Sequence, residues 1–428
     1  MARAMKDSGI EWIGEIPEGW ESKRLKYLVS YNDESLGEDT NPDYEFDYID
    51  IGSVEYGKGI TQYQHMRFAD SPSRARRVVH DKDVILSTVR TYLKAVATID
   101  DRDNPQIAST GFVVLRAKQG QITPDYLHYS VLSNAFVSLV EAKSTGISYP
   151  AINASEVVEI KIPVPKISEQ KRIADYLDSE CARIDAVIEQ TRASIEEYKK
   201  LKQSVITHAV TKGIRPVRKM KDSGIEWVGD IPEDWEVRRT KTLFRLRDEK
   251  NYLPLEEVNL ISLYTDKGVV QHCDLEQTTG NKASNADGYK KVYENDIVVN
   301  IILCWMGAIG RSAFTGVTSP AYDIYVPSDE IECRYYHHYF RTKGFSGDCY
   351  KRGKGIMAMR WRTYSDQFRD IPVVMPPKEE QQEILAYLDA KTAEIEKLIA
   401  KKEKFLSELE SYKKSLIFEY VTGKKEVL

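Results

Sequence analysis

The chain repeats part of itself, and this repeat constrains the fold more than any other feature of the sequence. Residues 5–20 read MKDSGIEWIGEIPEGW and residues 220–235 read MKDSGIEWVGDIPEDW, with thirteen of the sixteen positions identical. A second related pair lies near the end of each half, IPVPKISEQKRIADYLD at 162–178 and IPVVMPPKEEQQEILAYLD at 371–389. The spacing is far longer than that of solenoid repeats, so the pattern indicates a duplicated domain.

Two segments, 168–212 and 378–422, are predicted to be long helices. Apolar residues recur at a mostly three-to-four spacing in both; the first stripe runs through Ile173, Leu177, Ile184, Ile188, Ile195, Tyr198, Lys202 and Val205. Prolines precede each segment and Gly213 and Gly423 follow. About 43 helical residues span roughly 65 Å. A helix with one apolar stripe must bury it, and the natural partner is its own repeat. Two unrelated surface helices are the alternative.

The regions at roughly 21–161 and 236–370 differ in sequence but share an outline. Each contains a strand-like run after an acidic turn, then a tyrosine-rich helical piece, then a loop with glycine. These pieces are 81–89, 122–133 and 143–150 in the first region, and 294–302, 331–342 and 352–359 in the second. Short strands mixed with short helices indicate two α+β domains. A shared frame with different contents is the pattern of a reader with two specificities.

Motifs for catalysis are missing. The chain has neither a GxxxxGK[ST] phosphate loop nor a GxGxxG dinucleotide fingerprint. The segment Asn104–Ile107 lacks the second proline and the aromatic residue of an adenine-methyltransferase tetrapeptide. Asp43, Glu55 and Lys58 miss the spacing of a nuclease carboxylate cluster by one residue. Cys333, His337 and His338 make half a metal site at most, and we favour a core cysteine with surface histidines.

Charge and cysteine content limit which partners the chain can bind and in which cellular compartment it can lie. The formal net charge is −5, so any nucleic-acid binding must come from local basic patches. Five cysteines at scattered spacing suit a reducing cytoplasm better than a disulfide framework. There is no apolar run near the ~20 residues of a membrane span and no hydrophobic signal core, so we expect a cytoplasmic protein without a membrane partner.

Both repeated motifs are found in one known family. The first motif is SGIEWIGEIPEGWE (8–21) with its copy SGIEWVGDIPEDWE (223–236). The second opens each long helix and consists of Ile162-Pro163, Glu169-Gln170 and Tyr176-Leu177-Asp178, then Ile371-Pro372, Glu380-Gln381 and Tyr387-Leu388-Asp389. With both motifs duplicated in this order, the chain resembles the DNA-specificity (S) subunit of type I restriction–modification enzymes over essentially its full length.

The resemblance implies an architecture. Two globular α+β target-recognition domains are held apart by two long antiparallel helices, with a pseudo-twofold axis between the halves. On this sequence the parts are the first recognition domain with its repeat segment at 1–165, the central helix at 166–214, the second recognition domain at 215–375, and the C-terminal helix at 376–428. Each domain is expected to read one part of a bipartite, asymmetric site on double-stranded DNA.

The resemblance also implies partners. Methylation subunits, two in number, are expected to dock on this chain, and restriction subunits to join that complex. It implies no catalytic residue, cofactor or metal in this chain. S-adenosylmethionine, ATP and magnesium are expected in the partner subunits, which carry adenine-N6 methylation and ATP-dependent cleavage. A stand-alone coiled-coil DNA-binding scaffold or regulator without enzyme partners is the alternative, and a catalytic nuclease is a third.

Basic clusters with interleaved aromatic residues are the candidate DNA contacts, by direct readout or through phosphates. In the first domain they are Arg67, Arg74, Arg76, Arg77, Arg90, Tyr92 and Lys94. In the second they are Lys351, Arg352, Lys354, Arg360 and Arg362, with Trp361 between them. Solvated charged loops are the alternative for both sets. Trp305 and the glycines around 307–310 are predicted to belong to the core. Trp12, Trp20, Trp227 and Trp235 are predicted to pack against the helices, because identical repeats cannot read different bases.

Overall fold

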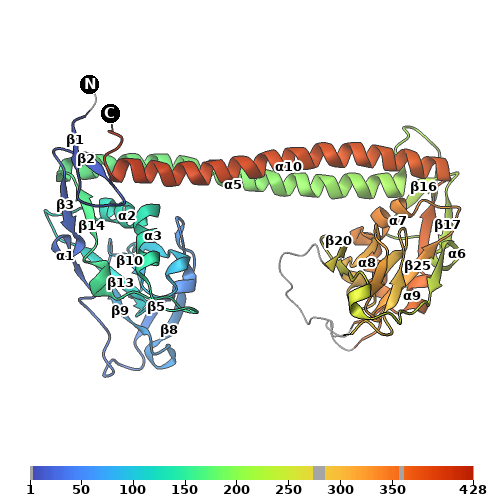
Figure 1. Cartoon of the computed structure of the whole chain (residues 1–428), viewed down its shortest axis with the longest axis horizontal. Helices are drawn as coiled ribbons and strands as arrows, with labels where there is room; N and C mark the ends of the chain where they lie inside the picture. Colours follow the sequence, from blue (N-terminus) through green and yellow to red (C-terminus); the bar gives the residue numbers. More distant parts are fainter. Residues whose placement is uncertain (1–2, 273–284, 356–360, 428) are drawn as a thin grey trace. The chain divides into compact units, whose positions relative to one another are not determined.

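The computed structural model describes residues 3–272, 285–355 and 361–427. The chain forms two compact units, Met1–Arg192 with Lys404–Leu428, and Ala193–Glu403. Each unit consists of one globular head and part of two long helices, α5 (Ile167–Lys212) and α10 (Lys378–Val421) (Figure 1). The two helices predicted from the apolar stripes are therefore confirmed, with ends within one residue of the prediction.

Each head is built on an antiparallel four-stranded sheet, and the two sheets match strand for strand. In the first head the order is β11-β10-β13-β4, from Val96–Thr98, Val84–Ser87, Phe112–Ala117 and Val29–Tyr31. In the second it is β23-β22-β25-β18, from Ile309–Arg311, Ile297–Asn300, Tyr322–Pro327 and Phe244–Arg247. The strand-like runs predicted at 81–89 and 294–302 supply the interior strands β10 and β22.

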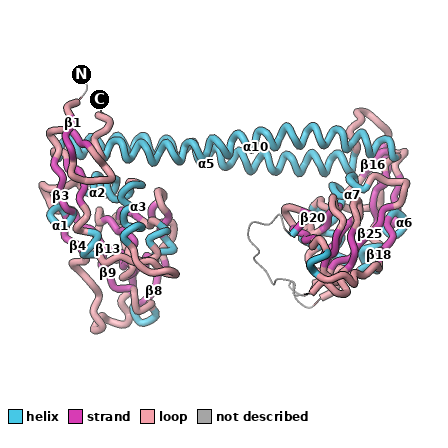
Figure 2. Tube along the Cα trace, in the orientation of Figure 1, coloured by secondary structure: helices cyan, strands magenta, loops and turns pink. Residues whose placement is uncertain are grey.

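Smaller elements repeat around these sheets. Two-stranded sheets join β1 (Met5–Asp7) to β2 (Glu15–Pro17) and β3 (Glu21–Arg24) to β14 (Lys161–Val164). Their counterparts join β15 (Met220–Asp222) to β16 (Asp230–Pro232) and β17 (Glu236–Arg239) to β26 (Pro372–Met375). The first head's helices are α1 (Leu25–Leu28), α2 (Pro124–Leu132), α3 (Asn134–Lys143) and α4 (Ala154–Val157). The second head's are α6 (Thr240–Leu243), α7 (Cys333–Phe340), α8 (Lys343–Arg352) and α9 (Ser365–Arg369). Both heads thus mix helices and strands, as the α+β prediction requires (Figure 2).

The heads diverge in the segments inserted between the first and second, and between the third and fourth, strands of this frame in chain order. The first head inserts a second four-stranded sheet, β8-β5-β12-β9, from Gln64–Arg67, Glu45–Ile49, Gln106–Ser109 and Ala75–Val79, and a hairpin of β6 (Val54–Glu55) and β7 (Gly59–Ile60). The described part of the second head has instead two short pairs, β19 (Ile261–Tyr264) with β20 (Gly268–Gln271), and β21 (Lys290–Val292) with β24 (Gly316–Thr318). The four-stranded sheet is therefore common to both heads, whereas the strands inserted into it differ between them.

The glutamine of each Glu-Gln signature ties a long helix to its head. Gln170 is fully buried; its Oε1 accepts from the Thr123 backbone N–H at 2.8 Å, and its Nε2 donates to the Pro165 carbonyl at 2.9 Å. Gln381 does the same, accepting from Glu332 N–H at 2.8 Å and donating to Pro376 at 2.8 Å. Thr123 and Glu332 are the N-cap residues of α2 and α7. The signature therefore fixes the start of the tyrosine-rich helix against the start of the long helix.

The glutamate of the signature binds the repeated amino-terminal segment. Glu380 is buried, pairs with Arg218 and accepts from Trp235 Nε1 at 3.0 Å. Glu169 forms an ion pair with Arg3 at 2.8 Å, and the Arg3 guanidinium lies 5.5 Å from the Trp20 ring centroid. Trp20 and Trp235 are fully buried, which confirms their predicted packing role.

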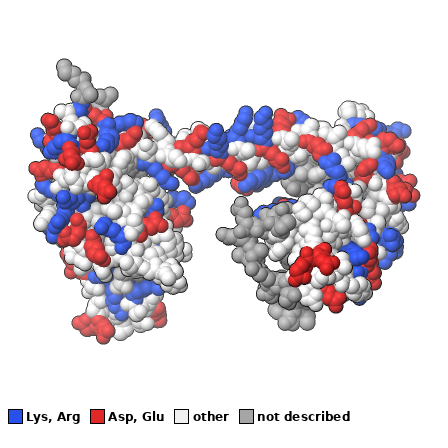
Figure 3. All heavy atoms as spheres, in the orientation of Figure 1, with Lys and Arg blue, Asp and Glu red and all other residues white. Residues whose placement is uncertain are grey.

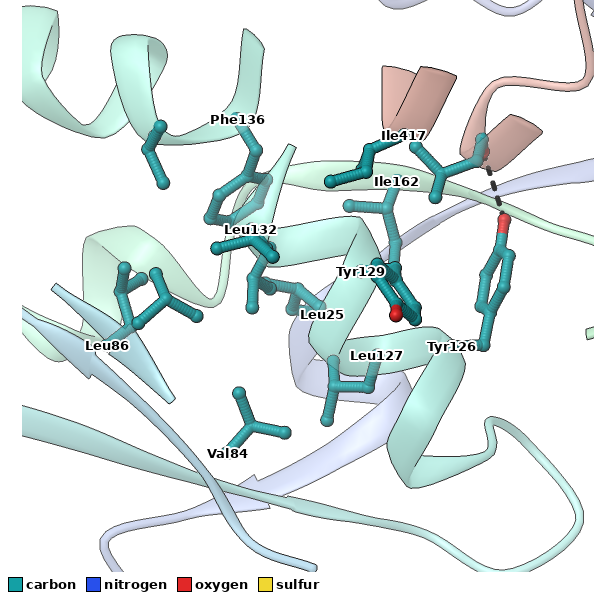
Figure 4. Close-up of a cluster of buried hydrophobic side chains, with 14 of the residues drawn as sticks. Leu25, Val84, Leu86, Tyr126, Leu127, Tyr129, Leu132, Phe136, Ile162 and Ile417 are labelled. Carbon is teal, nitrogen blue, oxygen red and sulfur yellow. Dashed lines mark hydrogen bonds between the residues drawn. The ribbon is translucent and has the colours of Figure 1, made fainter. Parts of the chain in front are cut away.

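In each unit the tyrosine-rich helix contacts the C-terminal end of a long helix. Helix α2 contacts α10 in the first unit, and α7 contacts α5 in the second. The Tyr126 hydroxyl lies 3.0 Å from the carbonyl oxygen of Val421, and the Tyr335 hydroxyl lies 2.6 Å from that of Val210. In the first unit Tyr126, Leu127 and Leu132 pack in one apolar cluster with Ile417 of α10 (Figure 4). The helix pair is consequently part of the core of each unit.

The helices α5 and α10 pair in antiparallel order. In the first unit Asp185 contacts Lys413 at 2.7 Å and Arg192 contacts Glu410 at 3.0 Å. In the second unit Tyr198 lies near Lys402, and Lys202 near Glu396. Residue numbers rise along α5 as they fall along α10. Exposed ion pairs contribute only about 0–1 kcal/mol each, so the buried stripe holds the pair together and the charges set its register.

Replacing Gln170 by alanine should lower the stability of the first unit. The substitution leaves the Thr123 N–H and the Pro165 carbonyl buried without a partner, at a cost of about 1–3 kcal/mol in the free energy of unfolding. Urea denaturation of the full chain measures this, with Gln190→Ala at an exposed position of the same helix as the control. Equal denaturation midpoints for the two variants would contradict the assigned role.

Candidate nucleic-acid interface

In each head one loop joins the two strands β10 and β11, or β22 and β23, and the two loops have the same construction. The Ser87 N–H donates to the Ala95 carbonyl at 2.9 Å, and the Asn300 N–H donates to Ala308 at 3.1 Å. Between these anchors lies a single 3-10 turn, η3 (Thr91–Leu93) or η6 (Cys304–Met306). The matching anchors make Tyr92 equivalent to Trp305 and Leu93 equivalent to Met306.

A second loop is fastened beside the first. Thr145 and Ala151 exchange backbone hydrogen bonds at 2.9 Å, and the Ile152 N–H donates to the Thr88 carbonyl at 2.9 Å. In the second head Lys354 and Arg362 exchange bonds at 2.8 and 3.0 Å, and the Thr363 N–H donates to Ile301 at 2.9 Å. We call these surfaces the paired loops: 88–94 with 145–151 in the first head, and 301–307 with the described residues of 354–362 in the second.

The paired loops of the first head present a cation among aromatic side chains. The Arg90 guanidinium lies 5.0 Å from the Tyr149 ring centroid, a cation–π distance. Arg90 and Lys94 both have left-handed backbone, with φ of 54° and 51°. Such conformations cost of order 1–3 kcal/mol in non-glycine residues and cluster at functional sites. The buried Thr91, whose hydroxyl donates to Ser144 Oγ at 2.8 Å, holds the turn in place.

The second head carries a row of three aromatic rings. Trp305 lies 5.6 Å from Tyr350, and Tyr350 stacks on Trp361 at 4.9 Å between centroids. Trp305 packs against the core yet is only partly buried, so its prediction as a core residue is half right. It lines a shallow groove of about 530 Å³ together with Met306, Arg341 and Lys343.

The predicted basic residues differ in how far their charges are compensated. In the second head Lys351 pairs with Glu226 and Arg352 approaches Asp370 at 3.8 Å, while Lys354 and Arg362 form no ion pair within the described residues. Arg360 lies outside the described residues. These cations flank the aromatic row, as the sequence predicts for the loop.

The first head's arginine cluster lies on and around the inserted sheet. Arg67 pairs with Asp43 at 3.4 Å and with Asp70 at 3.0 Å. Arg74 donates to the Tyr48 hydroxyl at 3.3 Å and lies 3.5 Å from Asp50, and these contacts raise its pKa.

The remaining arginines of that cluster, Arg76 and Arg77, lie on β9. The Arg76 guanidinium lies 4.8 Å from the Phe68 ring centroid, and Arg77 Nε is buried. The backbone of Arg74 is connected to the start of the paired loops: the Thr110 N–H donates to the Arg74 carbonyl, and the Thr88 N–H donates to the Gly111 carbonyl. The charges of Arg67 and Arg74 are balanced locally, which the sequence does not reveal. Figure 3 likewise shows acidic and basic side chains interleaved over the face in view.

Groups that could hold a metal ion do not assemble in the described parts of the chain. Within these residues no three His, Cys, Asp or Glu side chains come together as a metal site. Cys333 is buried as predicted, but His337 and His338 are partly buried rather than on the open surface, because α7 packs into the head. Among the described helices, none is long and apolar enough to cross a membrane.

A family model now decides the classification. The model for the type I restriction modification DNA specificity domain matches residues 17–197 and again residues 232–404. The chain belongs to this family. Its two specificity domains coincide with the two copies of the frame described above.

Relatives agree with this assignment. The putative type I restriction enzyme MjaX specificity subunit of Methanocaldococcus jannaschii is 26% identical over 439 residues, covering 97% of this chain and 96% of the relative. The MjaVIII specificity subunit of the same organism is 33% identical over 147 residues, 34% of this chain and 32% of the relative. The EcoDI specificity subunit of Escherichia coli is 23% identical over 295 residues, 62% of each.

Solved structures share the fold. One, from work on complex assembly and conformational transition of the type I R-M system, aligns with a TM-score of 0.74 and 21% identity over 96% of this chain and 99% of the other. The HsdS subunit from Thermoanaerobacter tengcongensis aligns with a TM-score of 0.54 and 22% identity over 96% and 98%. The specificity-subunit fold and its internal repeat, predicted from the duplicated motifs, are therefore confirmed.

The specificity subunit should lose stability on acidification partly through His128. Burial lowers the pKa of this imidazole to about 4, with Lys413 acting in the same direction and Asp178 opposing it. The unfolded chain takes up the proton near pH 6.5, so the free energy of unfolding falls as pH drops from about 6.5 to 4. In His128→Leu this part of the pH dependence should disappear. Thermal unfolding of both proteins between pH 7 and 5 measures it, and identical slopes would refute it.

Proposed function

We propose that this subunit reads a bipartite, asymmetric site on double-stranded DNA, one half-site with each head. The observation that carries the proposal is the frame: the same four-stranded sheet, the same turn and the same fastened loop occur twice, with different side chains at their tips. A frame that repeats fits two readers of the same design. Tips that differ fit two different half-sites, because base identity is read by particular side chains at base edges.

The partners we propose are two methylation subunits, with restriction subunits joining them. Each unit carries the same repeated segment, which would offer one kind of docking surface twice. Methylation of adenine, with S-adenosylmethionine, and ATP- and magnesium-dependent cleavage would belong to those partners. This division also suits the net charge of −5, since partners that clamp the duplex relieve this chain of neutralising most phosphates.

For DNA contacts we propose two groups. Arg90, Tyr92 and Lys94 of the first head and Lys351, Arg352, Lys354, Arg360 and Arg362 of the second belong to or flank the paired loops. Arg67, Arg74, Arg76 and Arg77, which lie on and around the inserted sheet, are proposed as phosphate contacts that position the head on the duplex.

Exchanging one head should change one half of the recognised sequence. If residues 21–161 are replaced by the corresponding region of a relative, the repeated motifs on either side of the exchanged region are kept. Only the first reading head then changes. Sequencing that detects N6-methyladenine gives the motif directly. A motif altered in both halves would show that the heads do not read independently.

Replacing Arg362 by alanine distinguishes base from phosphate contacts. A bidentate bond to guanine predicts a loss of about 1–3 kcal/mol and relaxed specificity at one base pair. A phosphate contact predicts uniform weakening and a smaller salt dependence. We expect Arg362 to behave as a base contact and Lys354→Ala as a phosphate contact, measured as affinity of the assembled methyltransferase at two salt concentrations. Unchanged DNA affinity in both variants would indicate that this loop is exposed to solvent and does not contact DNA.

Lengthening the long helix should alter the recognised spacer. The helix α5 is continuous and contributes Ile184 and Ile188 to one core and Ile206 and Val210 to the other. Inserting four residues after Gln190 adds about 6 Å and roughly one turn. The methylated motif should then show a longer spacer or be lost, whereas the original motif in unchanged yield would exclude the helix as a spacer.

A further inference from the structure

Apolar side chains gather at the tips of the paired loops. In the first head Tyr92 is 49% exposed, Leu93 38% and Tyr149 62%; in the second head Met306 is 54% exposed and Tyr350 48%. Single exposed apolar residues are ordinary, but a cluster on one surface indicates a binding site. Both heads place exposed apolar residues on the equivalent turn, Tyr92 and Leu93 on η3 and Met306 on η6, while Tyr149 comes from the neighbouring loop and Tyr350 from α8.

The backbone presents these side chains rigidly. Lys94 and Gly307, at equivalent positions directly after the turns, are both left-handed, with φ of 51° and 91°. The anchors on either side, from Ser87 to Ala95 and from Asn300 to Ala308, are ladder-like hydrogen bonds of the central sheets. A rigid tip loses little conformational entropy when it binds, so the exposed side chains are suited to a defined contact.

Cations lie at and beside the tips and differ in how far they are compensated, since Lys94 pairs with Glu141 at 3.4 Å. Arg90 stacks on Tyr149 and forms no ion pair within the described residues, and the same holds for Lys343 beside Trp305 in the groove. Arg341, by contrast, is fixed by the backbone carbonyls of Ile309 and Thr265 and serves the fold. Aromatic and aliphatic side chains beside the unpaired cations Arg90 and Lys343 are suited to bind a polyanion that carries flat apolar groups.

We propose that Tyr92 and Leu93 in the first head, and Trp305 and Met306 in the second, contact the bases of the two half-sites directly, against base faces or thymine methyl groups. The inference rests on the proposed function and assigns specificity to apolar side chains in addition to the arginines. DNA is favoured over a partner subunit because the tips occupy the same place with different side chains. Two copies of one partner would meet equal surfaces, whereas two half-sites require different ones.

Photocrosslinking tests the contact itself. The full chain assembled with its methylation subunits is bound to duplexes of its mapped methylation site, with 5-iodouracil replacing one thymine at a time. Mass spectrometry should find crosslinks to the peptide containing Tyr92 from one half-site and to the peptide containing Trp305 from the other. Crosslinks confined to peptides outside both turns would overturn the proposal.

Substitutions test specificity. The double variant Tyr92→Ala/Leu93→Ala, and separately Met306→Ala, should bind the cognate duplex about tenfold more weakly and tolerate base changes in one half-site each, with unchanged affinity for unrelated DNA. The controls are Tyr27→Ala on α1 and Tyr252→Ala in the second head, which remove exposed tyrosines away from the turns and should bind as the parent does.

Two outcomes would contradict the inference while leaving the proposed function standing. One is normal binding and specificity by the turn variants. The other is loss of the methylation subunits from the variants in size-exclusion chromatography, which would make the tips a protein-docking surface. A parent complex that shows no sequence preference at all would instead overturn the proposed function.

Discussion

The burial of two apolar helix stripes is the interaction on which the rest of the structure depends. Ile173, Leu177, Ile184 and Ile188 of α5 are buried with Leu416 and Ile417 of α10 and with the first head, in one cluster. Ile206 and Val210 are buried with Ile384 and Leu388 and the second head in another. Each fully buried residue of this kind contributes about 1.5–3 kcal/mol. Because the same side chains serve the helix pair and the head, neither can form its core without the other.

This shared core explains why two short motifs are repeated in both halves while the heads diverge. The signature Glu-Gln pair lies where a long helix enters its head, with Glu380 bonded to Trp235 of the repeated segment and Gln381 bonded to Glu332 at the start of α7. Leaving a buried polar group of this kind without its partner costs about 1–3 kcal/mol, so few sequences fit. The tips of the paired loops are under no such constraint, since the backbone hydrogen bonds of the central sheets are already formed on either side of them.

The sequence predicted the parts of the fold that depend on local pattern. Helical periodicity placed α5 and α10 to within a residue, and the duplicated motifs placed the two heads. It could not predict which basic residues remain free. Arg74 is compensated by Asp50 and Tyr48, which are distant in sequence and adjacent only across the inserted sheet. Trp305 is predicted to belong to the core, yet the turn that follows β22 leaves it at the rim of a groove, beside Tyr350. The ion pair of Arg3 with Glu169 also escaped prediction, because it joins the amino-terminal segment to a helix far along the chain.

The central claim is that this one chain determines both halves of a split recognition site. Mapping of N6-methyladenine across the genome, in cells with and without the gene for this chain and with the methylation subunit present in both, tests it most directly. The account predicts a motif of two different short sequences separated by a fixed spacer, methylated only when the chain is present. Methylation that is the same in both cells, or a motif that is contiguous or palindromic, would contradict it.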